Sequence, residues 1–273
     1  MSEQDPLKRI ADALERLTPD QPKSIDWTAQ PAYLWTGDDA RIVESLDTTP
    51  LATLRGIEAQ KQAVSENIAR LASGAAAHDM LLWGTRGMGK SALVRAAVQE
   101  LQAERSDAIA LVQLAPGAAA SFADLIEQLS NVDRAFLLFL DDLAFGATES
   151  QDMLALRSLL DGSVISRPGH IRLAVTSNRR AIVLREEQEN APLHERDERD
   201  NALALADRFG LTLGFHPCDR ETYLEILTAY TQPLGLAVDE EEALAWAIAR
   251  GNRSGRTAFQ FACELAGRAG QSL

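Results

Sequence analysis

The chain has 273 residues, 46% of them hydrophobic and 25% charged, which is the composition of a globular protein with one substantial core and a smaller appended unit. With 27 lysines and arginines against 40 aspartates and glutamates, its net charge of −13 disfavours general nucleic-acid binding and leaves only a local basic patch as a route to it. Two cysteines and four scattered histidines show none of the spacings typical of a disulfide framework or a zinc site.

The first 50 residues predict an N-terminal extension, with a helix at 5–17 and an irregular segment at 18–50 that holds four prolines. The N-terminus carries no secretory pattern. The longest apolar run in the chain, residues 135–140, is too short to span a bilayer. We therefore expect a cytoplasmic protein that has no membrane partner.

From residue 51 the pattern becomes regular. An amphipathic helix is predicted at 57–74, ending at Gly74, and short apolar strands then alternate with helical stretches. This alternation predicts an α/β core at 51–216, in which helices cover both faces of a parallel sheet. Residues 217–273 predict a small all-helical unit of about three helices. The predicted strands lie at 80–83, 109–114, 135–140, 171–177 and 211–215.

A glycine-rich loop follows the first of these strands. The segment GTRGMGKS fits the phosphate-loop pattern GxxxxGK[ST], whose glycines let backbone amides wrap closely around phosphate groups. Lys90 supplies positive charge to the β- and γ-phosphates, and the Ser91 hydroxyl is a ligand for Mg²⁺. The positions predicted to contact nucleotide in and after this loop are Gly84, Thr85, Arg86, Gly87, Met88, Gly89, Lys90, Ser91 and Ala92.

Two carboxylates, Asp141 and Asp142, end the strand at 135–140. Strand ends of a parallel sheet are where ligands bind, and buried adjacent charges need a compensating partner. Asp141 is the predicted metal residue, acting on Mg²⁺ directly or through water, and Asp142 is predicted to orient the attacking water. A turn capped by both aspartates is the alternative.

Two further candidate residues, one polar and one basic, lie at the ends of other predicted elements. Asn178, after the strand at 171–177, is predicted to sense the γ-phosphate, although a simple strand-to-turn transition also explains it. Arg256 lies in the first turn of the last helix, begun by Ser254 or Thr257, where a cation opposes the helix dipole. A bound γ-phosphate offsets that cost, as would Glu264 or a partner surface, and Arg253 is a weaker candidate for the same task.

In this order the motifs resemble the AAA+ ATPases over roughly residues 51–273. GTRGMGKS resembles Walker A, LLFLDDL resembles Walker B, TSN resembles the sensor 1 strand, and SGRTAFQF resembles the sensor 2 helix. The paired aspartates are similar to those of bacterial replication initiators and helicase loaders. The segments SNRR, LADRFGLTL and NRSGRTAFQF resemble more closely a bacterial AAA+ group catalogued as a domain of unknown function. The resemblance implies a parallel-sheet P-loop NTPase core with a helical lid, and it assigns Leu54, Gly56 and Ile57 to the adenine side.

The same resemblance gives Arg208, in the segment DRFG, the position of an arginine that reaches a neighbouring subunit's γ-phosphate. The alternative is a cation that stabilises the end of its own helix before Gly210. Many related ATPases carry glutamate where this chain has Asp142. The charged segment at 185–202 is read as a solvated loop, or as a loop that contacts a partner.

The expected function is therefore an ATPase with ATP and Mg²⁺ as cofactors. It assembles into a nucleotide-dependent homo-oligomer and remodels or loads an unidentified protein partner. A nucleotide-gated switch with slow or no hydrolysis is the alternative, because Asp142 is shorter than glutamate. A small-molecule P-loop kinase ranks last, since it does not explain the sensor and finger arginines. Arg179, Arg180 and Arg185 are the candidates for a local nucleic-acid track.

Overall fold

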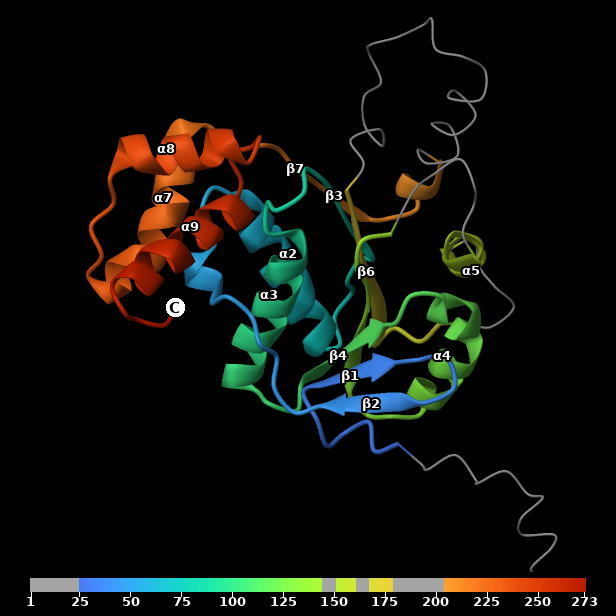
Figure 1. The fold of residues 1–273 in the computed structure, drawn as a ribbon. Helices are drawn as coiled ribbons and strands as arrows, with labels where there is room; N and C mark the ends of the chain where they lie inside the picture. Colours follow the sequence, from blue (N-terminus) through green and yellow to red (C-terminus); the bar gives the residue numbers. More distant parts are fainter. Residues whose placement is uncertain (1–24, 144–150, 161–166, 179–203) are drawn as a thin grey trace, which may run out of the picture.

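A seven-stranded sheet organises the chain in the computed structural model, which describes residues 25–143, 151–160, 167–178 and 204–273 (Figure 1). The strand order is β2-β1-β4-β5-β6-β3-β7, with β2 antiparallel to β1 and the other neighbours parallel. The predicted parallel-sheet architecture is confirmed. The strands are β1 (Ala32–Trp35), β2 (Ala40–Val43), β3 (Met80–Gly84), β4 (Ile109–Leu114), β5 (Ala135–Leu140), β6 (Ile171–Ser177) and β7 (Leu211–Phe215).

Helices cover both faces of this sheet (Figure 1). All six side chains of β5 are buried, and successive residues belong to different hydrophobic clusters because strand side chains alternate between faces. Leu137 and Phe139 pack with α2 (Glu58–Ala72) and α3 (Lys90–Glu104). Phe136 and Leu138 pack with the other group, formed by η2 (Ala118–Ser121), α4 (Phe122–Ser130) and α5 (Gln151–Leu160).

The expectation that residues 18–50 pack irregularly is wrong for β1 and β2, which extend the sheet beyond β4. Burial explains the difference, because Tyr33 and Trp35 are 1% and 0% exposed and contribute to the core on the α4 side. The buried Arg134 holds the preceding segment in place through hydrogen bonds to the carbonyls of Trp27, Thr28 and Gln30. Tertiary packing therefore decides the structure of this proline-containing segment.

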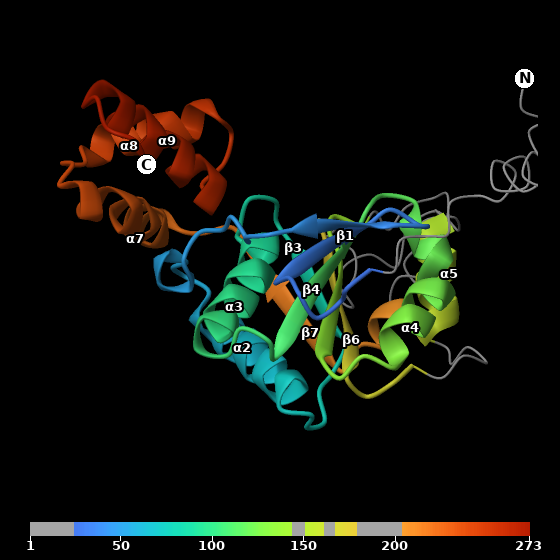
Figure 2. The ribbon, with the colours of Figure 1, turned by 90° about the horizontal axis from the view of Figure 1, so that it is seen from below.

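Three helices after β7 form the predicted helical lid at one end of the sheet (Figure 2). Asp219, Asp239 and Ser254 cap their N-termini, each accepting a hydrogen bond from an amide of the first turn. The helices are α7 (Arg220–Thr231), α8 (Glu240–Ala249) and α9 (Gly255–Arg268), with a short η4 (Gln232–Leu234) after α7. The boundary between core and lid at residue 216 stays a prediction.

Several predicted features lie outside the described residues. These are the helix at 5–17, the charged segment at 185–202 and the basic side chains Arg179, Arg180 and Arg185. In the part of the chain that is described, no helix is long and apolar enough to cross a membrane.

Candidate nucleotide-binding site

The glycine-rich loop joins β3 to α3 and has the backbone that its sequence requires. Gly84, Gly87 and Gly89 have φ angles of 119°, 77° and 86°, a region that side chains with a Cβ rarely adopt. A Cβ on Gly84 would lie 2.1 Å from the carbonyl oxygen of Phe215, so β7 leaves room there only for glycine. The loop ends at Lys90, the first residue of α3, where the helix dipole favours an anion.

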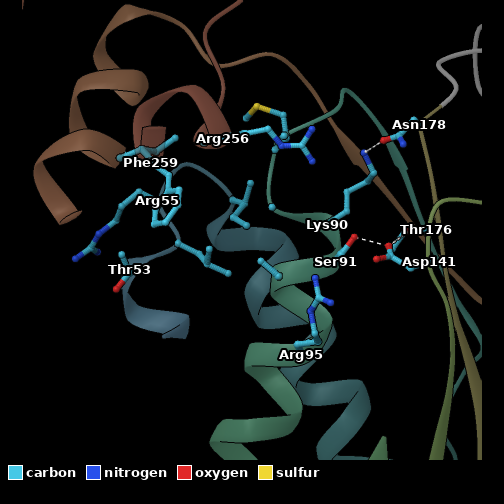
Figure 3. Close-up of a pocket in the computed structure, with 18 of the residues that line it drawn as sticks. Thr53, Arg55, Lys90, Ser91, Arg95, Asp141, Thr176, Asn178, Arg256 and Phe259 are labelled. Atoms are coloured by element: carbon cyan, nitrogen blue, oxygen red, sulfur yellow. Dashed lines mark hydrogen bonds between the residues drawn. The ribbon is translucent and has the colours of Figure 1, made fainter. Parts of the chain in front are cut away.

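Lys90 is buried beneath the loop, with 6% of its surface exposed. Its ammonium donates hydrogen bonds to the carbonyls of Gly84 (2.8 Å) and Thr85 (2.9 Å). It also donates to Asn178 Oδ1 at 2.9 Å (Figure 3). Burial lowers its pKa from 10.5 to about 8, although the carboxylates of Asp142 and Asp141 act in the opposite direction. An additional anion beside Nζ would stabilise the charged form of this lysine.

Asp141 lies at the end of β5, where two hydroxyl groups converge on one of its oxygens. Ser91 Oγ donates a hydrogen bond to Asp141 Oδ1, and Thr176 Oγ1 donates to the same atom at 2.7 Å (Figure 3). A carboxylate oxygen beside a serine hydroxyl is the donor set that Mg²⁺ prefers. Both Ser91 and Asp141 line the cavity, so the residues present fit a magnesium ion that accompanies a nucleotide.

Asp142 turns toward the phosphate loop because its backbone is left-handed, with φ of 58°. The Asp142 amide donates to Thr176 Oγ1 at 2.8 Å, which ties this turn to β6. Asn178 Nδ2 donates to Asp142 Oδ1, and Arg86 Nη2 lies 3.3 Å from Asp142 Oδ2. The structure thus brings Asp142, Asn178 and Lys90 together, although 36 to 88 residues separate the bonded pairs in the sequence.

A cavity of about 360 Å³ extends from these polar groups to the lid, a volume within the range of small-molecule sites (Figure 3). Leu54 and Ile57 line its apolar end with three lid residues, Ile226, Tyr230 and Phe259. The rings of Tyr230 and Phe259 meet edge to face at 5.3 Å. The remaining predicted residues in the lining are Gly87, Met88, Gly89, Lys90, Ser91, Ala92, Asp141, Asp142, Asn178 and Arg256.

Four predicted cofactor residues in the described chain do not line the cavity: Gly56, Gly84, Thr85 and Arg86. Gly56 instead faces the lid, because a Cβ at this position would lie 2.2 Å from Thr222 Cγ2 on α7. Gly84 and Thr85 present their carbonyls to Lys90, and Arg86 extends toward Asp142. The nucleotide contacts predicted for these four residues stay a prediction.

Arg256 joins the lid to the phosphate loop. Its amide donates to the Gly87 carbonyl at 3.0 Å, and its side chain lines the cavity. Ser254 caps α9 through the Thr257 amide, as one of the two predicted helix starts requires. A Cβ on Gly87 would lie 2.9 Å from Ser254 Oγ and 3.0 Å from Arg256 Cβ, so the glycine permits this close approach.

Arg208 is exposed and lies after the helical residues 204–206, before β7, as the sequence predicts. Its Nη1 donates to the carbonyl of Ala204 at 3.3 Å, the contact expected of a helix-end cation. Arg208 is not among the residues that line the cavity of its own chain. A role toward a second subunit stays a prediction.

Sequence reasoning missed the cavity-lining residues Thr53, Arg55, Arg95, Thr176, Ile226, Tyr230, Gly255 and Phe259. Thr176 had a local signal, since its hydroxyl lies near the end of buried strand β6, beside the aspartates that end the neighbouring strand β5. The lid residues had none, because only the closing of α7 and α9 over the loop brings them to the cavity.

Several solved structures are similar to this fold over most of the chain. The Holliday junction branch migration motor RuvB of Thermotoga maritima matches with a TM-score of 0.51 at 18% identity, covering 83% of this chain and 68% of that one. The Aeropyrum pernix ORC1 protein, solved in complex with DNA, matches with a TM-score of 0.58 at 17% identity, covering 83% and 66%. The FIGL-1 AAA domain, solved with ADP, gives 0.52 at 16% identity, covering 82% and 75%.

The fold is therefore that of the AAA+ P-loop ATPases. The family model described as "Protein of unknown function (DUF815)" matches residues 28–269, so the chain belongs to that family. No curated protein matches the sequence.

Proposed function

We propose that the protein is an ATPase that hydrolyses ATP at an interface between identical subunits and uses the cycle to remodel or load a macromolecular partner. The observation that carries the proposal is the cluster of Lys90, Asp141, Asp142 and Asn178 at one end of the cavity. A buried lysine, a hydroxyl–carboxylate pair and a second carboxylate lie together at the carboxyl ends of β3, β5 and β6. This is the set of groups that phosphoryl transfer requires.

Each side chain has a distinct task in the proposed reaction. Lys90 and the loop amides bind the β- and γ-phosphates, while Ser91 and Asp141 hold Mg²⁺, which neutralises phosphate charge when bound. Asp142 orients the attacking water and accepts its proton, and Asn178 positions that water without adding charge. Arg256 reports the γ-phosphate to the lid through its contact with Gly87.

Arg208 supplies the remaining positive charge from the neighbouring subunit. Support comes from its position in the DRFG segment, from its exposure, and from its place outside the cavity of its own chain. An exposed guanidinium can stabilise the charge of the transition state only if a second chain places it against the phosphates. The active site would then be complete only in an oligomer.

A protein partner is proposed in preference to nucleic acid. The printed descriptions of RuvB and ORC1 refer to a Holliday junction and to DNA. The net charge of −13 works against the same activity in this chain, since a field of that sign repels polyanions. A DNA-binding role would need a local basic surface.

Mg²⁺-dependent ATP turnover per subunit, measured across a wide range of protein concentration, tests the proposal. We expect specific activity to rise with concentration, to disappear in Lys90→Ala and to fall sharply in Arg208→Ala. Turnover that is independent of concentration and of Arg208 would contradict the shared site and leave Arg208 as a helix-end cation.

The second candidate function is a nucleotide-gated switch with slow or no hydrolysis. Asp142 favours it, because aspartate is one methylene shorter than glutamate and here already binds Asn178 and Arg86. Binding of ATP without turnover in the wild-type chain at high protein concentration would select this function over the first.

A further inference from the structure

Arg86 extends from the phosphate loop to the carboxylate that is proposed to orient water. Its Nη2 lies 3.3 Å from Asp142 Oδ2, and the side chains of the two residues are 70% and 54% exposed. The other oxygen of the same carboxylate, Oδ1, accepts a hydrogen bond from Asn178 Nδ2. Each oxygen of Asp142 therefore already has a donor before any water arrives.

The two partners of this ion pair are held very differently. The left-handed backbone of Asp142 is fixed by its amide bond to Thr176 Oγ1 and by the bond of the Leu143 amide to the Thr176 carbonyl, both 2.8 Å. Arg86 is attached only through an exposed, flexible side chain. Exposed ion pairs contribute little to stability, so a stronger anion can take the guanidinium away.

The phosphate loop contributes a second cation to the same polar network. Lys90 donates to Asn178 Oδ1, and the amide of Asn178 donates in turn to Asp142. Two cations of the loop, Lys90 and Arg86, are therefore both tied to side chains at the ends of β5 and β6. A terminal phosphate bound in the loop competes for both, and a guanidinium binds phosphate oxygens with two parallel hydrogen bonds.

We propose that the Arg86 side chain has two alternative positions. It holds Asp142 in the nucleotide-free and diphosphate-bound protein, and it moves to the terminal phosphate when a nucleoside triphosphate binds. The move releases Asp142 Oδ2 to face the attacking water. This inference rests on the proposed function and deepens it, because it makes Arg86 the side chain that distinguishes a triphosphate from a diphosphate.

Equilibrium binding to the full chain tests the proposal without relying on turnover. The probes are ADP and the non-hydrolysable triphosphate AMP-PNP, each with Mg²⁺, measured by calorimetry at a protein concentration held constant across variants. Arg86→Gln should weaken AMP-PNP binding about tenfold, the effect of losing one charged hydrogen-bond donor, and ADP binding less than about twofold. Arg86→Lys should recover part of the loss, since it keeps the charge but not the fork.

A double-mutant cycle adds a readout that a structural role would not move. Asp142→Asn should tighten AMP-PNP binding by a few fold when Arg86 is present, because the arginine is no longer held, and should have no such effect in Arg86→Gln. The matched control is Arg70→Gln, which removes an exposed arginine that pairs with Glu66 on α2. Both affinities should stay unchanged in this control.

Equal losses for ADP and AMP-PNP in Arg86→Gln would overturn the proposal and leave Arg86 as a support of the loop. Unchanged affinity for both would also overturn it and leave a surface ion pair. In either case Lys90→Ala should still abolish binding, so the proposed function would stand. If neither probe binds the wild-type chain, or if Lys90→Ala binds as tightly as the wild type, the proposed function fails together with this inference.

Discussion

Nucleotide binding should draw a proton onto Lys90 of the wild-type chain. Lys90 is 6% exposed, and burial is the main cause of its lowered pKa of about 8. Bound phosphates place negative charge beside Nζ and should raise the pKa back toward its ordinary value of 10.5. At pH 8 about half of the empty sites carry a neutral lysine, so binding should take up about half a proton per site. The expected uptake is close to one proton per site at pH 9 and about one tenth of a proton per site at pH 7.

Calorimetry of Mg²⁺–ADP binding measures this uptake when the titration is repeated at one pH in buffers of different ionisation enthalpy. Lys61→Met is the control, because this lysine pairs with Glu58 and the Leu54 carbonyl, away from the phosphates, and should leave the uptake intact. An uptake near zero at both pH 8 and pH 9 in the wild-type chain would refute the reasoning, since the buried lysine would then already be fully charged.

The same pKa predicts how the stability of the nucleotide-free protein depends on pH. The folded pKa lies below the unfolded value of 10.5, so the unfolded state binds more protons between pH 8 and 10.5. The free energy of unfolding should therefore gain from this residue as pH rises through that window, by about 3 kcal/mol in total. When urea unfolding is measured at pH 7 and pH 10, this gain in the free energy of unfolding should be absent in Lys90→Met.

Three further substitutions test the fold and the site. Gly84→Ala should lower the free energy of unfolding in urea by several kcal/mol and abolish ADP binding, because its Cβ would lie 2.1 Å from the Phe215 carbonyl oxygen. Gly74→Ala is the control: its φ is 74° but nothing lies within 4 Å of the added Cβ, so it should cost only about 1 kcal/mol. Arg134→Met should lower the free energy of unfolding by about 2–4 kcal/mol in the same assay, since it leaves the carbonyls of Trp27, Thr28 and Gln30 without this donor. It should also speed hydrogen exchange of the amides in β1, and unchanged exchange would show that the arginine does not hold the strand. Phe259→Ala should weaken ADP binding about tenfold while pyrophosphate binding and stability stay the same, because Phe259 is 42% exposed and lines the apolar end of the cavity. Equal weakening of ADP and pyrophosphate binding would show that the ring acts on the phosphates instead.

The polar end of the cavity was predictable because parallel strands bring their carboxyl ends to one edge. Asp141 and Asp142 follow one strongly apolar strand, Asn178 follows another, and the loop pattern fixes Lys90. These three distant segments meet because of the parallel topology alone. The sequence did not reveal the left-handed turn at Asp142, because that conformation depends on the hydroxyl of Thr176, 34 residues away.

The apolar end and the sheet extension depended on contacts that leave no local pattern. Tyr230 and Phe259 reach the cavity only because α7 and α9 pack together over the loop. The segment AYLWTGDDARIV does contain two aromatic or β-branched runs around a turn with Gly37 at φ of 118°, which is a hairpin signal. The nearby prolines favoured an irregular reading, whereas pairing with β4, more than 70 residues away, makes β1 a strand.

Mixing two inactive variants tests the proposed shared active site most directly. Arg208→Ala keeps a complete cavity but supplies no finger, whereas Lys90→Ala supplies the finger but binds phosphate poorly. At a head-to-tail interface, random assembly of an equimolar mixture pairs an intact cavity with an intact finger at roughly a quarter of the interfaces. We predict that the mixture recovers up to about that fraction of wild-type ATP turnover. A mixture no more active than the two variants measured separately, under conditions in which the wild-type chain turns over ATP, would contradict hydrolysis at a subunit interface.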